Sequence, residues 1–480
     1  MDQVFANRIG DEWRPSNSAR PNINPSDTAE VVGNYAQGSA TDVADAVAAA
    51  RAAFPAWSRS GPMERNAILM RASVEVAART EDLATLLARE EGKTLAEARG
   101  EVGRAAQILA FFAAEAVRLM GETGPSIRPG VTVEVTREPA GVIGIITPWN
   151  FPIAIPAWKI APALAYGNCV VFKPADLVPG CAWALTDILI RAGLPAGVLN
   201  LVMGPGRSVG QAMVMGRGID AITFTGSVAT GRGIAAACVA SQPMKKVQLE
   251  MGGKNPLVVL DDADLDVAVR IALDGAFFQT GQRCTASSRL IVTEGIHDRF
   301  VAALTQAMSG LTVGHALDPT TRIGPVADAA QLATDLSYLD KGRAEGARLV
   351  SGGEILNRPT PGHYLSPALF TEATTAMTIA REEIFGPVAC VIRVRDYDEA
   401  LAVANDSDFG LSAGICTTSL KHATHFRRNA EAGMVMVNLP TAGVDPHVPF
   451  GGRKGSSYGP REQGSYAREF YTIVKTGYVG

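Results

Sequence analysis

Cys284 is the side chain of this sequence best suited to covalent chemistry. It lies in the segment 278–289, FQTGQRCTASSR, directly after Arg283 and before small polar residues that predict a helix starting at Thr285. A positive neighbour and a helix N-terminus both favour thiolate over thiol, and a thiolate attacks carbonyl carbon atoms. Cys284 is therefore a candidate nucleophile, and a buried structural cysteine is the alternative.

Two further motifs supply groups that such a nucleophile needs. Glu250, in LEMGGKNP, ends a predicted strand before two glycines, so its carboxylate can reach a cleft and act as a general base for water. Asn150, in TPWNFP, follows another strand, and its amide could donate to an oxyanion together with the backbone N–H of Cys284. The alternative for Glu250 is a surface glutamate beside a turn, and the alternative for Asn150 is a helix N-cap.

Two loops have the residue types of a dinucleotide site. The segment FKPAD, 172–176, ends a strand with Lys173 and Asp176, which could bind ribose hydroxyls at the carboxyl edge of a parallel sheet. The segment FTGSVATG, 224–231, follows a strand and opens a helix, where small residues let a pyrophosphate approach. Its spacing departs from G-x-G-x-x-G, and the first loop also fits a plain charged βα connection, so each signal alone is weak.

These motifs fall on alternating strands and helices, which is typical of parallel α/β sheets. The predicted strands are 132–136, 142–146, 170–172, 198–202, 221–224, 247–251, 257–260, 290–292, 389–394, 434–437 and 472–479. The predicted helices are 41–54, 63–90, 95–120, 157–165, 179–192, 206–215, 231 onward, 265–278, 285 onward and 297–308. The last strand alternates like a sheet edge that pairs across a subunit boundary.

Composition excludes several classes of protein. With 480 residues the chain predicts two or three domains, and its 44 basic and 48 acidic residues give no basic excess for nucleic acid. The apolar runs are too short to cross a membrane, and residues 1–20 lack the apolar core of a signal peptide, so a cytoplasmic location is expected. The six cysteines include no C-x-x-C pair, which argues against a metal site or disulfide framework.

Taken together, the motifs resemble one family over essentially the whole chain. The ordered series TPWNFP, KPAD, FTGS, LEMGGKNP, GQRC, EEIFGP and PFGG is similar to that of the aldehyde dehydrogenase superfamily. The resemblance implies an α/β fold with a Rossmann-like NAD domain, an α/β catalytic domain and a small β oligomerisation arm. The implied boundaries are 1–117 and 139–250 for the dinucleotide domain, 251–452 for the catalytic domain, and 118–138 and 463–480 for the arm.

The same resemblance assigns roles by matching position. The implied catalytic residues are Cys284 as nucleophile, Glu250 as base and Asn150 as oxyanion donor. The implied cofactor-binding residues are Ile146, Thr147, Trp149, Lys173, Asp176, Gly206, Ser227, Glu383 and Phe385. The implied substrate-binding residues are Phe151, Trp158, Arg283 and Phe450. Because related enzymes that transfer the acyl group to coenzyme A generally lack the glutamate, its presence favours hydrolysis to the acid.

The expected substrate is a small aldehyde, ranked by the residues near the cysteine. GQRCTASSR and KPADLVPGCAWAL resemble the α-ketoglutarate semialdehyde enzymes, and Arg283 could hold a carboxylate in bidentate fashion or form a structural ion pair. Trp158 and Phe278 stand where the usual succinate-semialdehyde enzymes carry a clamp of arginines. We therefore rank an ω-semialdehyde acid such as α-ketoglutarate semialdehyde first, succinate semialdehyde second and an uncharged aldehyde third.

Cofactor choice and assembly complete the expectations. Asp176 accepts from ribose hydroxyls and repels a 2′-phosphate, which favours NAD, although its short side chain leaves NADP open. The resemblance implies a homodimer or homotetramer. A non-catalytic structural relative is the other class of protein considered, and the presence of Cys284, Glu250 and Asn150 argues against it.

Overall fold

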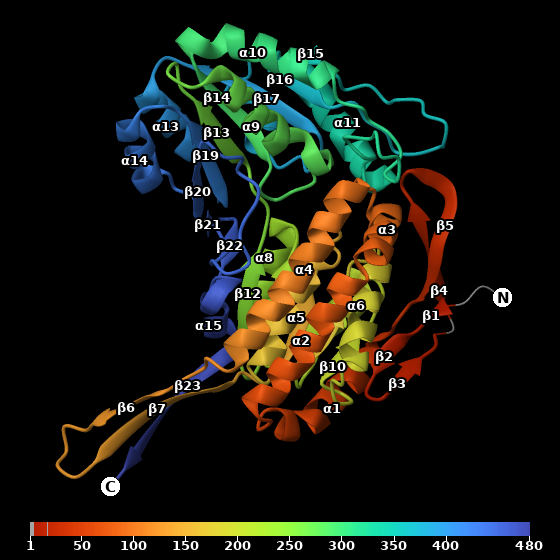
Figure 1. Ribbon diagram of the computed structural model, residues 1–480, viewed down its shortest axis with the longest axis vertical. Coiled ribbons are helices and arrows are strands. Elements are labelled where there is room, and N and C mark those ends of the chain that lie inside the picture. Colours follow the sequence, from red (N-terminus) through yellow and green to blue (C-terminus); the bar gives the residue numbers. More distant parts are fainter. Residues whose placement is uncertain (1–3, 17) are drawn as a thin grey trace.

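A computed structural model describes residues 4–16 and 18–480 of the protein. The chain forms two α/β bodies, each built on a central sheet, and a narrow three-stranded arm that extends from one of them (Figure 1). None of the helices in the described ranges is both long and apolar enough to cross a membrane. The same ranges hold no cluster of three or more His, Cys, Asp or Glu side chains suited to a metal ion.

The first body has an eight-stranded sheet. Its order is β22 (Ser457–Tyr458), β12 (Lys246–Glu250), β11 (Ala221–Thr225), β8 (Val142–Ile146), β9 (Cys169–Lys173), β10 (Leu199–Leu201), β2 (Asn7–Ile9) and β3 (Glu12–Arg14). The five strands from β12 to β10 are parallel, and nearly every residue in them is buried. Because β8 lies between β9 and β11, the strand order reverses there, and ligands bind at such switch points.

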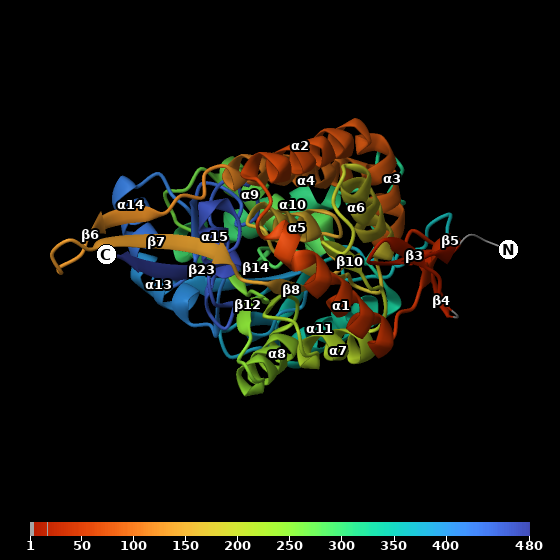
Figure 2. The same cartoon turned by 90° about the horizontal axis from the view of Figure 1, so that it is seen from below.

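Helices cover both faces of this sheet, as Figure 2 shows. One face carries α5 (Ala154–Ala165) and α6 (Pro179–Arg191), with α2 (Pro62–Ala78), α3 (Thr80–Glu91) and α4 (Leu95–Ala116) packed outside them. The other face carries α1 (Ala40–Trp57), the π-helical turn Gly206–Gly210 with α7 (Gln211–Met215), and α8 (Val228–Ala240). Strand and helix alternation thus produces the doubly wound arrangement expected of it.

The single helix predicted over 63–90 is wrong, because the structure has two. The chain leaves helical geometry at Arg79, with φ −102° and ψ 23°, and α3 restarts with Glu81 and Asp82 in its first turn. Acidic residues favour a helix N-terminus, so this pair starts a new helix instead of continuing the old one. Next, Thr94 caps α4 through a capping box with Glu97, and this box fixes where α4 begins.

The second body has a seven-stranded sheet flanked by helices. Its order is β15 (Arg348–Ser351), β16 (Ala368–Thr371), β17 (Val388–Val394), β14 (Ser287–Thr293), β13 (Asn255–Val259), β19 (Ser412–Cys416) and β20 (Met434–Val437). Its helices are α9 (Leu265–Phe277), α10 (Glu294–Ser309), α11 (Ala329–Ala344), α12 (Thr378–Arg381), α13 (Tyr397–Asn405) and α14 (Leu420–Asn429). All strands pair in parallel except β15, which is antiparallel to β16.

The helix predicted from Thr285 onward does not exist. After a 3₁₀ turn at Phe278–Gly281, the chain passes Cys284 and enters β14 at Ser287. This strand lies between β13 and β17 in the middle of the sheet, where SSRLIVT is almost fully buried. Tertiary packing therefore overrides the local preference of small residues for a helix start, and Cys284 has no helix N-terminus behind it.

The hydrophobic core of the first body gives way to those of the second body shortly after residue 251 in the sequence. The core of the first body includes Met251 as its last residue before the second body, whereas the two cores of the second body begin with Leu257 and Val258. After the second body, the chain returns to the first sheet as β22, then forms the 3₁₀ turn Gly464–Ala467 and α15 (Arg468–Tyr471). The domain boundaries stated above remain a prediction.

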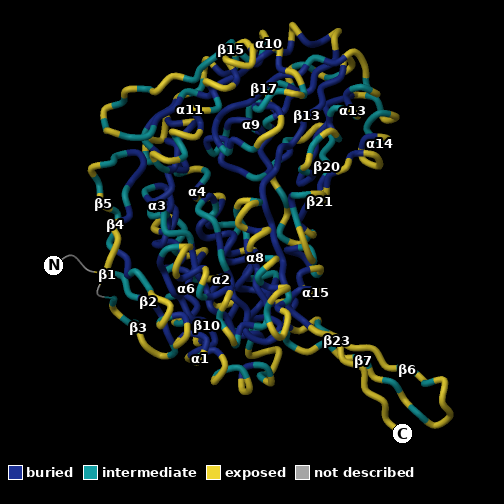
Figure 3. The backbone as a smooth tube through the Cα atoms, turned by 180° about the vertical axis from the view of Figure 1, so that it is seen from behind, coloured by how far each residue is buried: buried dark blue, intermediate teal, exposed yellow. Residues whose placement is uncertain are grey.

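The arm consists of β6 (Glu122–Pro125), β7 (Thr132–Pro139) and β23 (Thr472–Val479). β7 pairs antiparallel with both neighbours, and its eight residues alternate between exposed and half-buried. Figure 3 shows mostly exposed backbone along the arm, in contrast to the buried interiors of the two bodies. The remaining small sheets are β1 (Val4–Phe5), β5 (Asp27–Ala36) and β4 (Ala19–Asn24), and β18 (Phe409–Gly410) with β21 (Arg453–Lys454).

Candidate active site

A cavity of about 780 Å³ lies where the two bodies meet. The predicted site residues that line it are Trp149, Asn150, Phe151, Trp158, Ser227, Glu250, Arg283, Cys284, Glu383, Phe385 and Phe450. The candidate nucleophile, base and oxyanion donor therefore share one space. Ile146, Thr147, Lys173, Asp176 and Gly206 are not part of its lining; they lie at or beyond the carboxyl ends of β8 and β9 and in the loop after β10.

Cys284 keeps some accessible surface in the cavity but is enclosed by protein. Asn255 Nδ2 donates to its backbone carbonyl oxygen at 2.8 Å, which fixes the main chain. Burial raises the pKa of the Cys284 thiol far above its ordinary value, and the nearby carboxylates of Glu383 and Glu250 raise it further. The expectation that the local environment favours the thiolate is wrong for this state, because no helix follows Cys284 and Arg283 has only a small effect.

Arg283 lines the cavity, but its guanidinium contacts the end of α9. Its guanidinium donates to the carbonyl oxygens of Asp274 and Gly275 at the end of α9, the second at 3.1 Å, and lies 3.6 Å from the Asp274 carboxylate. Only 9% of the residue is exposed. The geometry is that of the structural ion pair, the alternative to carboxylate binding.

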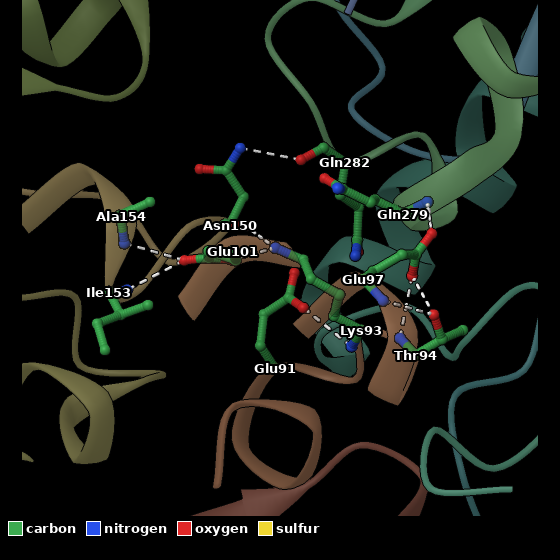
Figure 4. A network of polar contacts seen from close by, with 10 residues as sticks. All are labelled: Glu91, Lys93, Thr94, Glu97, Glu101, Asn150, Ile153, Ala154, Gln279 and Gln282. Carbon is green, nitrogen blue, oxygen red and sulfur yellow. Dashed lines mark hydrogen bonds and ion pairs between the residues drawn. The ribbon is translucent and has the colours of Figure 1, made fainter. Parts of the chain in front are cut away.

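Asn150 is fixed at both ends. Its side-chain Nδ2 donates to the backbone carbonyl oxygen of Gln282 at 2.9 Å. Its backbone carbonyl oxygen accepts from Lys93 Nζ at 2.8 Å (Figure 4). An amide nitrogen carries two hydrogens, so one remains for an oxyanion near Cys284. The N-cap alternative does not hold, because α5 starts at Ala154 with no side-chain cap.

A buried charge network supports the Asn150 loop, and the sequence analysis missed it. Lys93 Nζ pairs with Glu101 Oε2 at 2.6 Å, with both side chains buried, while Glu101 Oε1 accepts from the backbone N–H groups of Ile153 and Ala154 at 3.1 Å each (Figure 4). Burial lowers the pKa of Lys93, but Glu101 and Glu91 outweigh it and the net pKa is raised. Lys93 is therefore a stable cation.

Glu97, one turn before Glu101, extends this network to the cysteine loop. Its Oε1 accepts from the backbone N–H of Gln279 at 2.8 Å, and its Oε2 accepts from Thr94 (Figure 4). The first two turns of α4 thus hold both the segment with Asn150 and the segment that leads to Cys284. The only sequence signal for this role was the capping box itself.

Glu250 is buried at the end of β12, so the surface-glutamate alternative is wrong. Its Oε2 accepts from Ser457 Oγ at 2.6 Å. Burial, and then the proximity of Glu462, raise the pKa of Glu250 well above its ordinary value. Glu462 itself is paired with the buried Lys159, which also donates to Thr223 Oγ1 at 2.7 Å. A carboxylate with a raised pKa is a stronger base, as general-base chemistry requires.

The carboxyl ends of β8, β9 and β11 have unsatisfied polar atoms that fit a dinucleotide. Lys173 Nζ lies 3.8 Å from Asp176 Oδ1, and that oxygen is buried with no hydrogen-bond partner among the described residues. The hydroxyls of Thr147 and Thr225 are likewise buried and unpartnered in the described chain. Ser227 caps α8, so the first backbone N–H groups of this helix face the same edge, where phosphate groups bind.

The remaining predicted cofactor residues lie on both sides of that edge. Glu383 Oε1 accepts from the backbone N–H of Gly253 at 2.8 Å, and burial raises its pKa to about 7. Phe385 meets Trp149 edge-on, with ring centroids 5.4 Å apart. Ile146 is half-buried at the end of β8, and Gly206 is exposed at the start of the π-helical turn.

The substrate side of the cavity is aromatic. The rings of Trp158 and Phe450 lie 5.5 Å apart and tilted by 33°, and Lys93 Nζ lies 4.1 Å from the centre of the Phe151 ring. These residues come from α5, from the loop before it and from the segment near the C-terminus. They form an apolar wall for an aliphatic chain.

Comparison with known proteins identifies the family. Residues 13–477 match the model of the aldehyde dehydrogenase family. The α-ketoglutaric semialdehyde dehydrogenase of Bacillus subtilis is 45% identical over 480 residues, covering 99% of this chain and 98% of the relative. Two solved structures have TM-scores of 0.96: betaine aldehyde dehydrogenase from Staphylococcus aureus in complex with NAD+, 33% identical with 99% and 95% covered, and an E. coli NADP dependent enzyme, 36% identical with 99% and 98% covered.

The chain therefore belongs to the aldehyde dehydrogenase family. It is an NAD(P)-dependent oxidoreductase that acts on an aldehyde. The family resemblance and the fold expected from the sequence are both confirmed.

Proposed function

We propose that this protein oxidises an ω-semialdehyde acid, of the kind represented by α-ketoglutarate semialdehyde, to the dicarboxylic acid with NAD. The observation that carries the catalytic part is that Cys284, Asn150 and Glu250 line one cavity, although they come from three segments far apart in the sequence. The substrate class is supported by the relative from Bacillus subtilis, which is named for α-ketoglutaric semialdehyde and matches along its full length.

Cys284 begins the reaction. Loss of the thiol proton, for which Glu250 and Glu383 are the neighbouring carboxylates, gives a thiolate that attacks the aldehyde carbon. The oxygen becomes negative in this step. Asn150 Nδ2 and the backbone N–H of Cys284 stabilise it, and one such donor contributes roughly 3 kcal/mol to the transition state.

Loss of hydride from the tetrahedral adduct leaves a thioester on Cys284. A nicotinamide held beside Glu383 and Phe385 would supply the hydride acceptor. Glu250, once ionised, takes a proton from water, and the resulting hydroxide attacks the thioester. The acid is released and the Cys284 thiolate is restored. The buried base is the reason to expect water, not coenzyme A, as the acyl acceptor.

NAD is the cofactor that the ribose site supports better than NADP. The unpartnered oxygen of Asp176 can accept from a ribose hydroxyl, and its negative charge opposes a 2′-phosphate. Lys173 and Asp176 would hold the adenosine ribose, Ser227 and the start of α8 the pyrophosphate, and Glu383 with Phe385 the nicotinamide end. Ile146, Thr147, Trp149 and Gly206 would complete the cofactor contacts.

The arm supports assembly into a homodimer or homotetramer. Ile473, Val474, Tyr478 and Val479 of β23 are all more than half exposed in the single chain. An exposed sheet edge with apolar residues is a template for pairing with another copy. Sedimentation of the full chain, compared with a chain that ends before Thr472, tests this proposal.

The proposed substrate class is tested by comparing matched aldehydes. We would measure kcat/KM with NAD for α-ketoglutarate semialdehyde, succinate semialdehyde and butanal, with and without coenzyme A. A preference for the acids of tenfold or more, about 1.4 kcal/mol, supports the proposal. Equal or better use of butanal contradicts the substrate class but leaves the chemistry of Cys284 intact, and a requirement for coenzyme A contradicts hydrolysis.

A further inference from the structure

We infer that Arg104 on α4, and not Arg283 beside the nucleophile, binds the carboxylate of the substrate. The inference rests on the proposed function, because it assumes that the substrate is an aldehyde with a distal carboxylate. It assigns the specificity for a substrate carboxylate to α4, a helix that contains none of the sequence motifs.

Three arginines line the cavity, and two of them are already paired. Arg99 makes a bidentate contact with Glu81, from Nε to Oε1 and from Nη2 to Oε2, both at 2.8 Å. Arg283 is bound to Asp274 and to carbonyl oxygens at the end of α9. Arg104 has no carboxylate oxygen within 4.0 Å anywhere in the described ranges. Within the described residues its side chain makes one hydrogen bond, from Nη2 to Gln463 Oε1 at 3.2 Å.

The surroundings of Arg104 favour an incoming anion. The side chain is half-buried, and this burial lowers its pKa, while the more distant Asp445 opposes that effect only in part. A partly desolvated cation without a partner is unfavourable, because it has lost hydrogen bonds to water. A carboxylate bound in bidentate fashion replaces those hydrogen bonds. Glu97 and Glu101, the carboxylates of α4 that line the cavity, do not pair with Arg104, because they contact Lys93, the helix cap and the catalytic loops.

The position of Arg104 on α4 suits a short aliphatic chain. Arg104 follows Glu101 by three residues, so it lies on the same face of the helix, about 4.5 Å further along the axis. Glu101 contacts the loop that carries Asn150, which marks the catalytic end of the cavity. Gly100 and Gly103 also line the cavity, and a Cβ at either would meet no atom within 4 Å, so this face of the helix is open.

The proposed substrate is a short chain with a charged group at its far end. A chain of five carbons has four carbon–carbon bonds of about 1.5 Å, which span roughly 5 Å between the aldehyde carbon and the carboxylate carbon. The aldehyde would lie at Cys284, the methylene groups against Trp158 and Phe450, and the carboxylate at Arg104. This arrangement replaces the arginine clamp whose usual positions hold Trp158 and Phe278 here.

The decisive experiment compares Arg104→Met with Arg99→Met. Arg99 is the matched control, because it lines the same cavity, lies on the same helix and already has a partner. For each enzyme, kcat and KM are measured with α-ketoglutarate semialdehyde and with pentanal, its uncharged five-carbon counterpart. We expect Arg104→Met to lower kcat/KM for the acid by tenfold or more, mainly through KM, and to change that for pentanal by less than threefold. Arg99→Met should change neither beyond threefold.

The outcomes separate this inference from the proposed function. If the wild-type enzyme does not prefer the acid to pentanal, the proposed substrate class fails. If it does prefer the acid and Arg104→Met keeps that preference, Arg104 is not the carboxylate site. Arg104→Lys, which retains the charge, should recover part of the preference; if lysine and methionine variants lose activity equally for both aldehydes, the role of Arg104 is structural and the inference is overturned.

Discussion

The catalytic end and the cofactor end of the site differ in how their loops are held. The loops that carry Asn150 and Cys284 are fixed by contacts with α4, as in the pairing of Lys93 with Glu101 and the contact of Glu97 with Gln279, although Gln279 Oε1 and Arg283 Nε stay buried without a partner in the described chain. At the carboxyl ends of β8, β9 and β11, by contrast, Thr147, Thr225 and Asp176 each keep a buried oxygen without a partner in the described chain. The catalytic loops are preorganised by the protein itself, whereas the cofactor edge is completed by a ligand.

The largest effect should come from Cys284→Ser. Serine is close in size, but its hydroxyl is a much weaker nucleophile, so we expect kcat to fall by about 10³ or more. The formation of reduced cofactor measures the activity, and calorimetry measures the affinity for NAD. Because the cofactor edge is separate, NAD should bind within threefold of the wild-type affinity; a large loss of binding would contradict the separation of the two ends.

Glu250→Gln should stop the reaction after hydride transfer. The amide cannot accept a proton from water, so we expect a burst of reduced cofactor and a steady-state rate lower by about 10²–10⁴. Mass spectrometry should detect the acyl group on the protein. Absence of a burst would show that Glu250 is needed to form the thioester and not only to hydrolyse it.

The pH dependence of this second step follows from the raised pKa of Glu250. Only the ionised carboxylate acts as a base, and burial shifts its ionisation to higher pH. The rate of thioester hydrolysis in the wild type should therefore rise with pH above the ordinary range of a glutamate and level off once Glu250 is ionised. The residual rate of Glu250→Gln should lack this rise.

Lys93→Met tests whether the buried charges preorganise the Asn150 loop. The change leaves Glu101 buried without its cation, which costs about 3–5 kcal/mol of stability when a buried pair is broken. Urea unfolding measures this loss, and kcat should fall because the backbone of Asn150 loses its contact with Nζ.

The double variant Lys93→Met with Glu101→Gln is the control. It removes both charges, so it should recover part of the stability lost in Lys93→Met while kcat stays low. If the single variant has normal kcat despite lower stability, the pair supports the fold and not the oxyanion donor.

The sequence revealed the residues whose chemical type is itself the signal. Cys284, Glu250 and Asn150 lie in motifs whose residue types and order are informative, and the strand before Asn150, VIGII, is a short apolar run that is easily recognised. The structure brings all three to one cavity.

The direction of a side chain is what the sequence did not supply. Arg283 is next to Cys284 in the chain, and this adjacency suggested that it could bind the substrate. Its guanidinium instead contacts α9. Lys93 lies in the short connection between α3 and α4 and Arg104 lies on α4, and a charged residue in either place usually faces solvent. Their roles depend on packing between α4 and loops far away in the sequence, which periodicity does not encode. The helix expected at Thr285 failed for a related reason, since a central strand position decides that segment.

Asp176→Ser should have the smallest effect and tests the cofactor end alone. Serine removes the charge that opposes a 2′-phosphate and one acceptor for the ribose hydroxyl, so the ratio of kcat/KM for NADP to that for NAD should rise about tenfold. Asp187→Ser, on the adjacent α6, is the control for a general change of charge, and its ratio should stay within twofold. The activity at saturating cofactor should remain close to that of the wild type, because Asp176 is not among the residues that line the catalytic cavity. A fall in that activity with an unchanged ratio would show that the two ends are coupled, and the distinction between them would then fail.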